Sequence, residues 1–172
     1  MRRNFLVVAV VLMFGAVASL AAQAKPDFSG KWVQDPPPAA APAGGGGGGG
    51  GRGGGGGGGR GGFGAEFTIV QNAKTLTITR MQGDQTVSTV YNLDGSESKN
   101  TTQGRGGPQE QVSKAVWAGA TLVVTTTINA GGNNIEQKRV FAMEGGNLTI
   151  ETTQPGRDGG PGTPQKTTYK KG

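Results

Sequence analysis

The sequence of 172 residues lacks cysteine and histidine altogether, and aromatic residues make up only 6% of it. These absences exclude Ser-His and Cys-His catalytic pairs, thiolate nucleophiles, zinc fingers, disulfide bonds and any imidazole that exchanges protons near neutral pH. Carboxylates remain, but the 11 Asp and Glu residues lie mostly beside turn signals, and their spacing suggests neither a glycosidase pair nor a calcium site. We therefore expect a protein that is not an enzyme and that uses no metal or cofactor.

Residues 1–24 have the organisation of a secretory signal peptide. Two arginines precede a mostly apolar run over residues 5–20, and Ala22-Gln23-Ala24 offers the small side chains that a signal peptidase accepts. We expect cleavage between Ala24 and Lys25, which leaves no stable membrane anchor and places the mature chain in the periplasm or outside the cell. The alternative is an uncleaved N-terminal anchor, because the apolar run approaches the roughly 20 residues that span a bilayer.

Glycine and proline dominate residues 36–64, where Pro36-Pro37-Pro38 is followed by a glycine tract with few interruptions. Such a composition offers too little apolar surface to offset the entropy lost on ordering. We expect a disordered linker that separates a first strand, residues 25–35, from the rest of the β-domain, residues 65–172.

Near the end of this linker, Arg60-Gly61-Gly62-Phe63-Gly64 resembles an RGG box of RNA-binding proteins. Arg52 and Arg60 are the two cations of the linker, and so few charges release little counterion from a nucleic-acid backbone. The expected export also keeps the chain away from RNA. We expect no nucleic-acid binding.

From residue 65 onward, apolar and polar residues alternate with a period of two, which predicts β-strands. In residues 74–79, for example, Leu76 and Ile78 alternate with threonines. The same pattern predicts strands over residues 67–71, 86–93, 97–103, 109–117, 121–129, 135–142, 148–153 and 165–170. Turn signals such as Asp94-Gly95 and Gly145-Gly146 separate them at intervals of about 10 to 13 residues, which are too short for crossover helices.

Strands so closely spaced must pair with their neighbours in sequence. We expect an all-β domain, an antiparallel up-and-down meander of eight to ten strands that carries the Gly-rich insertion. Closure into a barrel is favoured because it removes the two exposed edges. An open sheet or a sandwich is the alternative.

A short motif on the first strand carries a resemblance to known barrels. Gly30-Lys31-Trp32 resembles the G-x-W signature of lipocalin and avidin-type barrels, and residues 27–32 followed by Thr-rich strands are similar to small exported bacterial proteins described as lipocalin-like. The resemblance implies that Trp32 packs across the closed end of the barrel, under a cation from the last strand. Lys170 or Lys171 would supply that cation.

Alternation also selects the side chains expected inside the barrel. Ten of them are our candidates for contact with a ligand: Trp32, Phe67, Ile69, Leu76, Ile78, Tyr91, Trp117, Leu122, Phe141 and Ile150. The same inward face is expected for Leu93, Val116, Val124, Ile128, Leu148 and Tyr169. These residues either fill the barrel or line a cavity, and Trp117 lies either at its mouth or in its core. The cations of the strands, among them Lys138 and Arg139, are scattered, and we expect them on the solvated surface.

The expected function is the binding of a small apolar or amphipathic molecule inside an exported, non-catalytic barrel. The alternative is an envelope protein with a structural or interaction role. Its outer face would then contact polysaccharide, anionic lipid or a protein partner, helped by a net charge that falls from +6 to +4 when the two arginines of the signal peptide are removed.

Overall fold

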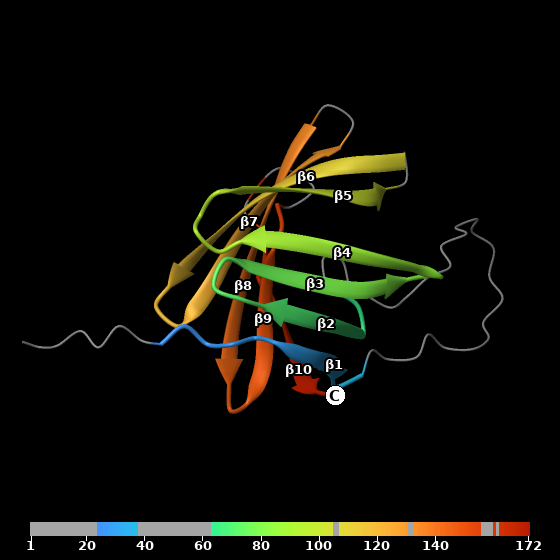
Figure 1. The fold of residues 1–172 in the computed structure, drawn as a ribbon. Coiled ribbons are helices and arrows are strands. Elements are labelled where there is room, and N and C mark those ends of the chain that lie inside the picture. The colour runs from blue at the N-terminus through green and yellow to red at the C-terminus, as the bar shows by residue number, and fades with distance from the viewer. Residues whose placement is uncertain (1–23, 38–62, 105–106, 131–132, 156–159, 161) are drawn as a thin grey trace, which may run out of the picture.

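The computed structural model describes residues 24–37, 63–104, 107–130, 133–155, 160 and 162–172. Within these residues the chain forms ten β-strands and no helix (Figure 1). The strands are β1 (Gly30–Asp35), β2 (Glu66–Gln71), β3 (Thr75–Gln82), β4 (Gln85–Asn92), β5 (Glu97–Gly104), β6 (Gly107–Ala118), β7 (Thr121–Ala130), β8 (Asn133–Glu144), β9 (Asn147–Thr153) and β10 (Gln165–Lys171). The expected signal peptide up to residue 23 and residues 38–62 of the expected linker lie outside the described residues.

Every strand predicted beyond residue 65 is present, with ends that differ from the expected ones by at most three residues. Threonine and β-branched aliphatic residues fit a pleated surface with one buried face, which is why the local pattern is so informative here. Tight hairpins join several strands. At the turn between β8 and β9, Gly145 and Gly146 have φ of 58° and 83°, values that favour glycine over other residues.

The ten strands form one sheet in the order β4-β3-β2-β1-β10-β9-β8-β7-β6-β5, and every ladder is antiparallel. β1 pairs with both β2 and β10, so the beginning and the end of the β-domain lie side by side. The sheet curls until its edge strands β4 and β5 face each other (Figure 1). The all-β up-and-down meander is thus confirmed, and it forms a nearly closed barrel.

Side chains bridge the seam between β4 and β5, which share no backbone ladder within the described strands. The Asn100 amide accepts a hydrogen bond from the Val90 N–H (2.8 Å) and donates one to the Val90 carbonyl (2.9 Å). Nearby, the Asn92 N–H donates to Ser98 Oγ (2.7 Å) and the Asn92 amide donates to the Glu97 carbonyl (2.9 Å). These contacts satisfy backbone groups that an open edge would leave to solvent.

The first strand begins at Gly30 and not at residue 25, because the segment before it crosses one end of the barrel. Phe28 is fully buried there and stacks on Trp117, with ring centroids 5.8 Å apart. Its carbonyl accepts a hydrogen bond from the indole of Trp32 (2.8 Å), and its N–H donates to the side chain of Gln71 (3.0 Å). This segment closes that end of the barrel.

The G-x-W motif has a direct structural explanation. Gly30 has φ of 140°, and a Cβ at this position would lie 2.9 Å from Cε of Lys171. The Lys171 side chain crosses this position, and its Nζ lies 5.9 Å from the ring centroid of Trp32. Lys171 is therefore the cation that the resemblance implied, whereas Lys170 forms an ion pair with Asp35 (2.8 Å).

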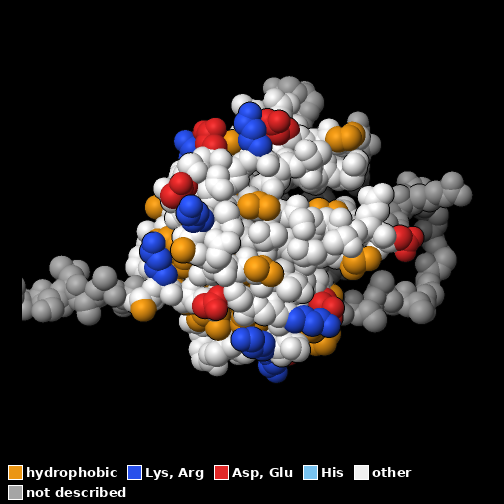
Figure 2. All heavy atoms as spheres, in the orientation of Figure 1, with side chains coloured by type: hydrophobic (Ala, Val, Ile, Leu, Met, Phe, Trp, Pro, Cys, Tyr) orange, Lys and Arg blue, Asp and Glu red, His pale blue; other side chains and the backbone are white. Residues whose placement is uncertain are grey.

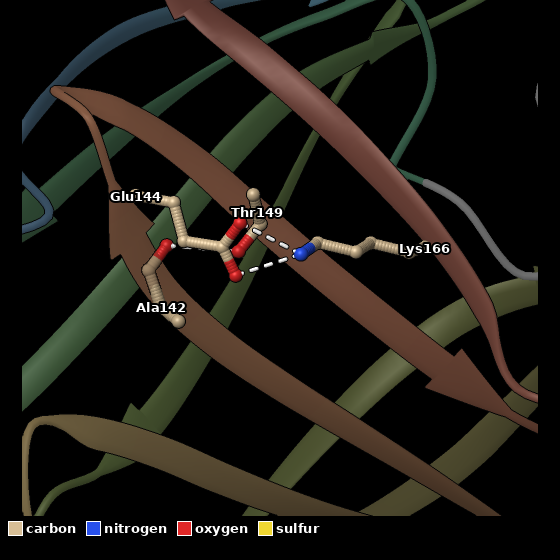
Figure 3. A network of polar contacts seen from close by, with 4 residues as sticks. All are labelled: Ala142, Glu144, Thr149 and Lys166. Carbon is tan, nitrogen blue, oxygen red and sulfur yellow. Dashed lines mark hydrogen bonds and ion pairs between the residues drawn. The ribbon is translucent and has the colours of Figure 1, made fainter.

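On the side of the barrel that Figure 2 shows, charged side chains of both signs are interspersed, and apolar side chains appear mostly singly. In one ion pair, Nζ of Lys166 on β10 donates to both carboxylate oxygens of Glu144 at the end of β8 (2.7 Å each). Figure 3 shows this pair beside Thr149 of β9, whose hydroxyl donates to the Ala142 carbonyl. The hydrogen bonds from Lys166 hold the pKa of Glu144 below its usual value.

Candidate functional site

The predicted interior residues come together in one cluster. Nine of the ten candidates are at most 3% exposed: Trp32, Phe67, Ile69, Leu76, Ile78, Tyr91, Leu122, Phe141 and Ile150. The tenth, Trp117, is partly buried and packs against the same cluster. The prediction for Val116 is wrong, since this side chain is 55% exposed while its neighbour Ala115 is fully buried. The pleat directs Ala115 and Trp117 inward, so the residue between them must point outward.

The inner face of β6, β7, β8 and β9 changes from apolar to polar along the strands. Residues paired directly across strands share a face, and three such rows follow one another on this face. An apolar row consists of Trp117, Leu122, Phe141 and Ile150. The next is the arginine row, formed by Ala115, Val124, Arg139 and Thr152. Beyond it, and extending to β5, the polar row is formed by Ser98, Ser113, Thr126 and Gln137.

Arg139 faces the barrel interior, so its expected place on the solvated surface is a wrong prediction. It lies on the same face of β8 as the buried residues Gln137 and Phe141, and its side chain is hydrogen-bonded to Tyr91 of β4. Arg80 of β3 approaches the same region. Arg139 was expected outside because it is charged. It stands two residues before Phe141 in the same strand, however, and residues two apart in a strand share a face, which was a signal for the inner face.

Phe63 joins the two arginines. Its ring centroid lies 4.8 Å from the guanidinium carbon of Arg139 and 5.9 Å from that of Arg80. The ring is 4% exposed and packs on Phe67 (5.4 Å) and Phe141 (5.8 Å). Phe63 was expected in a disordered linker, and the structure places it in the core. Burial of one large aromatic ring offsets the entropy of ordering the few residues that carry it.

Burial and charge act together on the titratable groups of this region. Burial lowers the pKa of Arg139, and the nearby charge of Arg80 lowers it further, while Tyr91 acts in the opposite direction. Burial raises the pKa of Tyr91 and the pKa of Tyr169, so both phenols stay protonated at neutral pH. The hydroxyl of Tyr169 is hydrogen-bonded to the backbone of Phe63. The described Asp and Glu side chains are exposed, apart from the partly exposed Asp35.

A hollow lies at the end of the barrel that the segment before β1 crosses. This cleft has a volume of about 290 Å³ and is lined by Lys25, Asp27, Gln71, Asn72, Ala73, Leu93 and Trp117. Nζ of Lys25 lies 5.5 Å from the Trp117 ring centroid. Asp27 and Asn72 use their carboxylate and amide oxygens to bind backbone N–H groups of adjacent turns. Trp117 thus lies at a barrel end, half in the core and half on the wall of this cleft.

No group of three or more acidic side chains that could hold a metal ion occurs in the described part of the chain. The same residues include no helix of a length and apolarity suited to crossing a membrane.

Comparison with known proteins identifies similar folds at low sequence identity. No protein-family model and no curated protein sequence matches the chain. Human cRBP IV is 16% identical with a TM-score of 0.48, over 86% of this chain and 99% of that one. The REP1-NXSQ fatty acid transporter is 10% identical, with a TM-score of 0.46 over 62% and 69%. A zebrafish ileal bile acid-binding protein complexed with cholic acid is 24% identical, with a TM-score of 0.44 over 62% and 72%. The likeness concerns the barrel fold and no particular residue.

Proposed function

We propose that this chain is an exported, non-catalytic barrel protein that binds a small amphipathic anion in its interior. The observation that carries the proposal is the position of Arg139, which lies on the inner face of β8 between the apolar row and the polar row and is hydrogen-bonded to Tyr91. An amphipathic anion has a matching arrangement: its apolar chain corresponds to the apolar row, and its charged group corresponds to Arg139. Such a ligand would match the interior without burying a polar group against an apolar one.

A bound anion would relieve two unfavourable effects on Arg139. Burial and the neighbouring charge of Arg80 both disfavour its charged form. A carboxylate or similar group between the two guanidiniums would oppose both effects and would receive charge-assisted hydrogen bonds. The protonated hydroxyl of Tyr91, already in contact with Arg139, adds a further donor.

The apolar part of the ligand would lie against the apolar row and the aromatic side chains around it. Phe63 covers both guanidiniums, so the ligand must pack against its ring or displace it. Phe67 and Tyr169, with ring centroids 4.7 Å apart, form the neighbouring wall.

An envelope interaction through the outer face has less support. Five of the lysines form ion pairs with carboxylates: Lys31, Lys99, Lys114, Lys166 and Lys170. Cations that are paired in this way contribute less to an attraction for anionic polymers or lipids.

Isothermal titration calorimetry of the purified chain with dodecanoate, below the concentration at which it forms micelles, tests the proposal. We expect saturable binding to one site. Arg139→Met should weaken it by about tenfold or more, since a hydrogen bond to a charged group contributes roughly 1.5 to 3 kcal/mol.

Lys138→Met is the matched control, because it removes the adjacent cation on the exposed face of the same strand. This variant should bind dodecanoate as tightly as the unmodified chain. Absence of saturable binding, or equal weakening by the two substitutions, would contradict an interior anion site.

A further inference from the structure

The polar row places four hydrogen-bonding side chains inside the barrel, and all of them are buried. Ser98, Ser113, Thr126 and Gln137 are between 1% and 6% exposed. Buried polar groups are costly unless each finds a partner. Ser113 and Thr126 share a hydrogen bond between their hydroxyls (2.9 Å), and Ser98 accepts one from the Asn92 N–H (2.7 Å).

Gln137 differs from the other members of the row. Its side-chain oxygen is buried and accepts no hydrogen bond from any of the described residues. Gln137 also lies next to the proposed anion site, two residues before Arg139 and on the same face of β8. The two Cα atoms are therefore roughly 7 Å apart, and both side chains are long enough to meet adjacent groups of one ligand.

We infer that Gln137 selects, among amphipathic anions, those that carry a hydroxyl group within a few carbons of the charge, such as 2- or 3-hydroxy acids. This inference rests on the proposed function. The amide oxygen requires a hydrogen-bond donor, which a carboxylate does not have and a hydroxyl group supplies. The amide oxygen of Gln137 thereby gains a partner only when such a ligand is bound.

The position of the hydroxyl follows from the order of the rows. Arg139 holds the anion, and the apolar row lies on the side of Arg139 away from Gln137. The apolar chain therefore extends towards Phe141 and Leu122, both fully buried. A hydroxyl at the far end of the chain would be left among apolar side chains, whereas one beside the anion reaches the polar row.

Calorimetric titration with three ligands of equal chain length tests the inference: dodecanoate, 3-hydroxydodecanoate and 12-hydroxydodecanoate. The unmodified chain should bind 3-hydroxydodecanoate about tenfold more tightly than dodecanoate, as expected for one additional buried hydrogen bond. The 12-hydroxy isomer should bind no more tightly than dodecanoate. Gln137→Met keeps the length of the side chain and removes the acceptor, and it should bind dodecanoate and 3-hydroxydodecanoate equally.

Gln103→Met is the control, since Gln103 is exposed on β5 and its substitution should leave the preference unchanged. Equal affinity of the unmodified chain for all three ligands would overturn the selectivity and leave the anion site standing. A preference that persists in Gln137→Met would overturn the role of this residue. Failure of all three ligands to bind would overturn the proposed function together with the inference. The comparison on the unmodified chain holds even where the Gln137 variant does not fold.

Discussion

The guanidinium carbon of Arg139 lies 4.8 Å from the ring centroid of Phe63. This contact joins the middle of β8 to a residue that lies just before β2, at the end of the glycine tract. A cation over an aromatic face is attracted by the ring quadrupole, and the attraction is larger where water is excluded. The contact therefore ties the chain after the tract to the interior of the barrel, beside the proposed anion site.

Replacement of Phe63 by alanine should lower the free energy of unfolding by about 3 kcal/mol, because a large buried ring is lost and a cavity remains. Urea denaturation measures this change. Val70→Ala serves as the control, since Val70 is 61% exposed and its substitution should change stability by no more than about 0.5 kcal/mol. A similarly small effect at position 63 would show that the ring does not belong to the core.

Asn100 should protect the seam of the barrel. In Asn100→Ala the Val90 N–H loses its acceptor, and its hydrogen exchange should accelerate by about tenfold, the equivalent of one hydrogen bond. Asn100→Asp keeps the acceptor and should retain most of the protection at Val90. Asn129→Ala, near the end of β7 and away from the seam, is the matched control. Unchanged exchange at Val90 in Asn100→Ala would show that the amide does not bridge the two edges.

Gly30→Ala should destabilise the chain by about 1 to 3 kcal/mol, because φ of 140° is strained for any residue with a Cβ. The new Cβ would also displace Lys171 from Trp32, so the tryptophan fluorescence should shift. Gly107→Ala separates the two effects, since Gly107 also has positive φ but faces open space. That variant should lose stability without the fluorescence shift, and an unshifted spectrum in Gly30→Ala would contradict the contact between Lys171 and Trp32.

The Glu144 carboxyl should titrate below its usual pKa of 4.5 in the folded chain, because Lys166 donates hydrogen bonds to its charged form. Because the pKa of this carboxyl is lower in the folded chain than in the unfolded chain, its ionised form stabilises the fold. This stabilisation is fully present at pH values above the unfolded-state pKa and is lost as the pH falls through the folded-state pKa. NMR titration of the carboxyl measures the shift directly. Lys166→Met should return the pKa towards 4.5, and Lys138→Met should not change it.

The strands could be predicted from sequence because each depends on a local alternation of apolar and polar residues. Leu76 and Ile78 on β3 are examples, both buried as expected. The up-and-down order followed from the short intervals between strands, and most of the interior followed from the phase of each strand. The error at Val116 arose because the wrong one of two alternating sets of residues in β6 was expected to point inward.

Three residues of the candidate site could not be found in this way. Arg139 and Gln137 are polar, and hydropathy places polar residues outside, although both lie in phase with Phe141. Phe63 is a single aromatic residue at the end of a tract whose composition indicates disorder. What places each of them inside is tertiary contact: the hydrogen bond between Tyr91 and Arg139 and the packing of Phe63 on Phe67 and Phe141.

The most direct measurement of the central claim is a ¹³C NMR pH titration of carboxyl-labelled dodecanoate bound to the chain. A carboxylate held by Arg139 and Arg80 should give a resonance distinct from that of the free ligand. It should stay ionised at pH values where the free ligand is protonated, since nearby cations lower the pKa of a carboxyl group. In Arg139→Met the bound carboxyl should titrate closer to the free ligand. A bound carboxyl that titrates like the free acid in the unmodified chain would contradict an anion site inside the barrel.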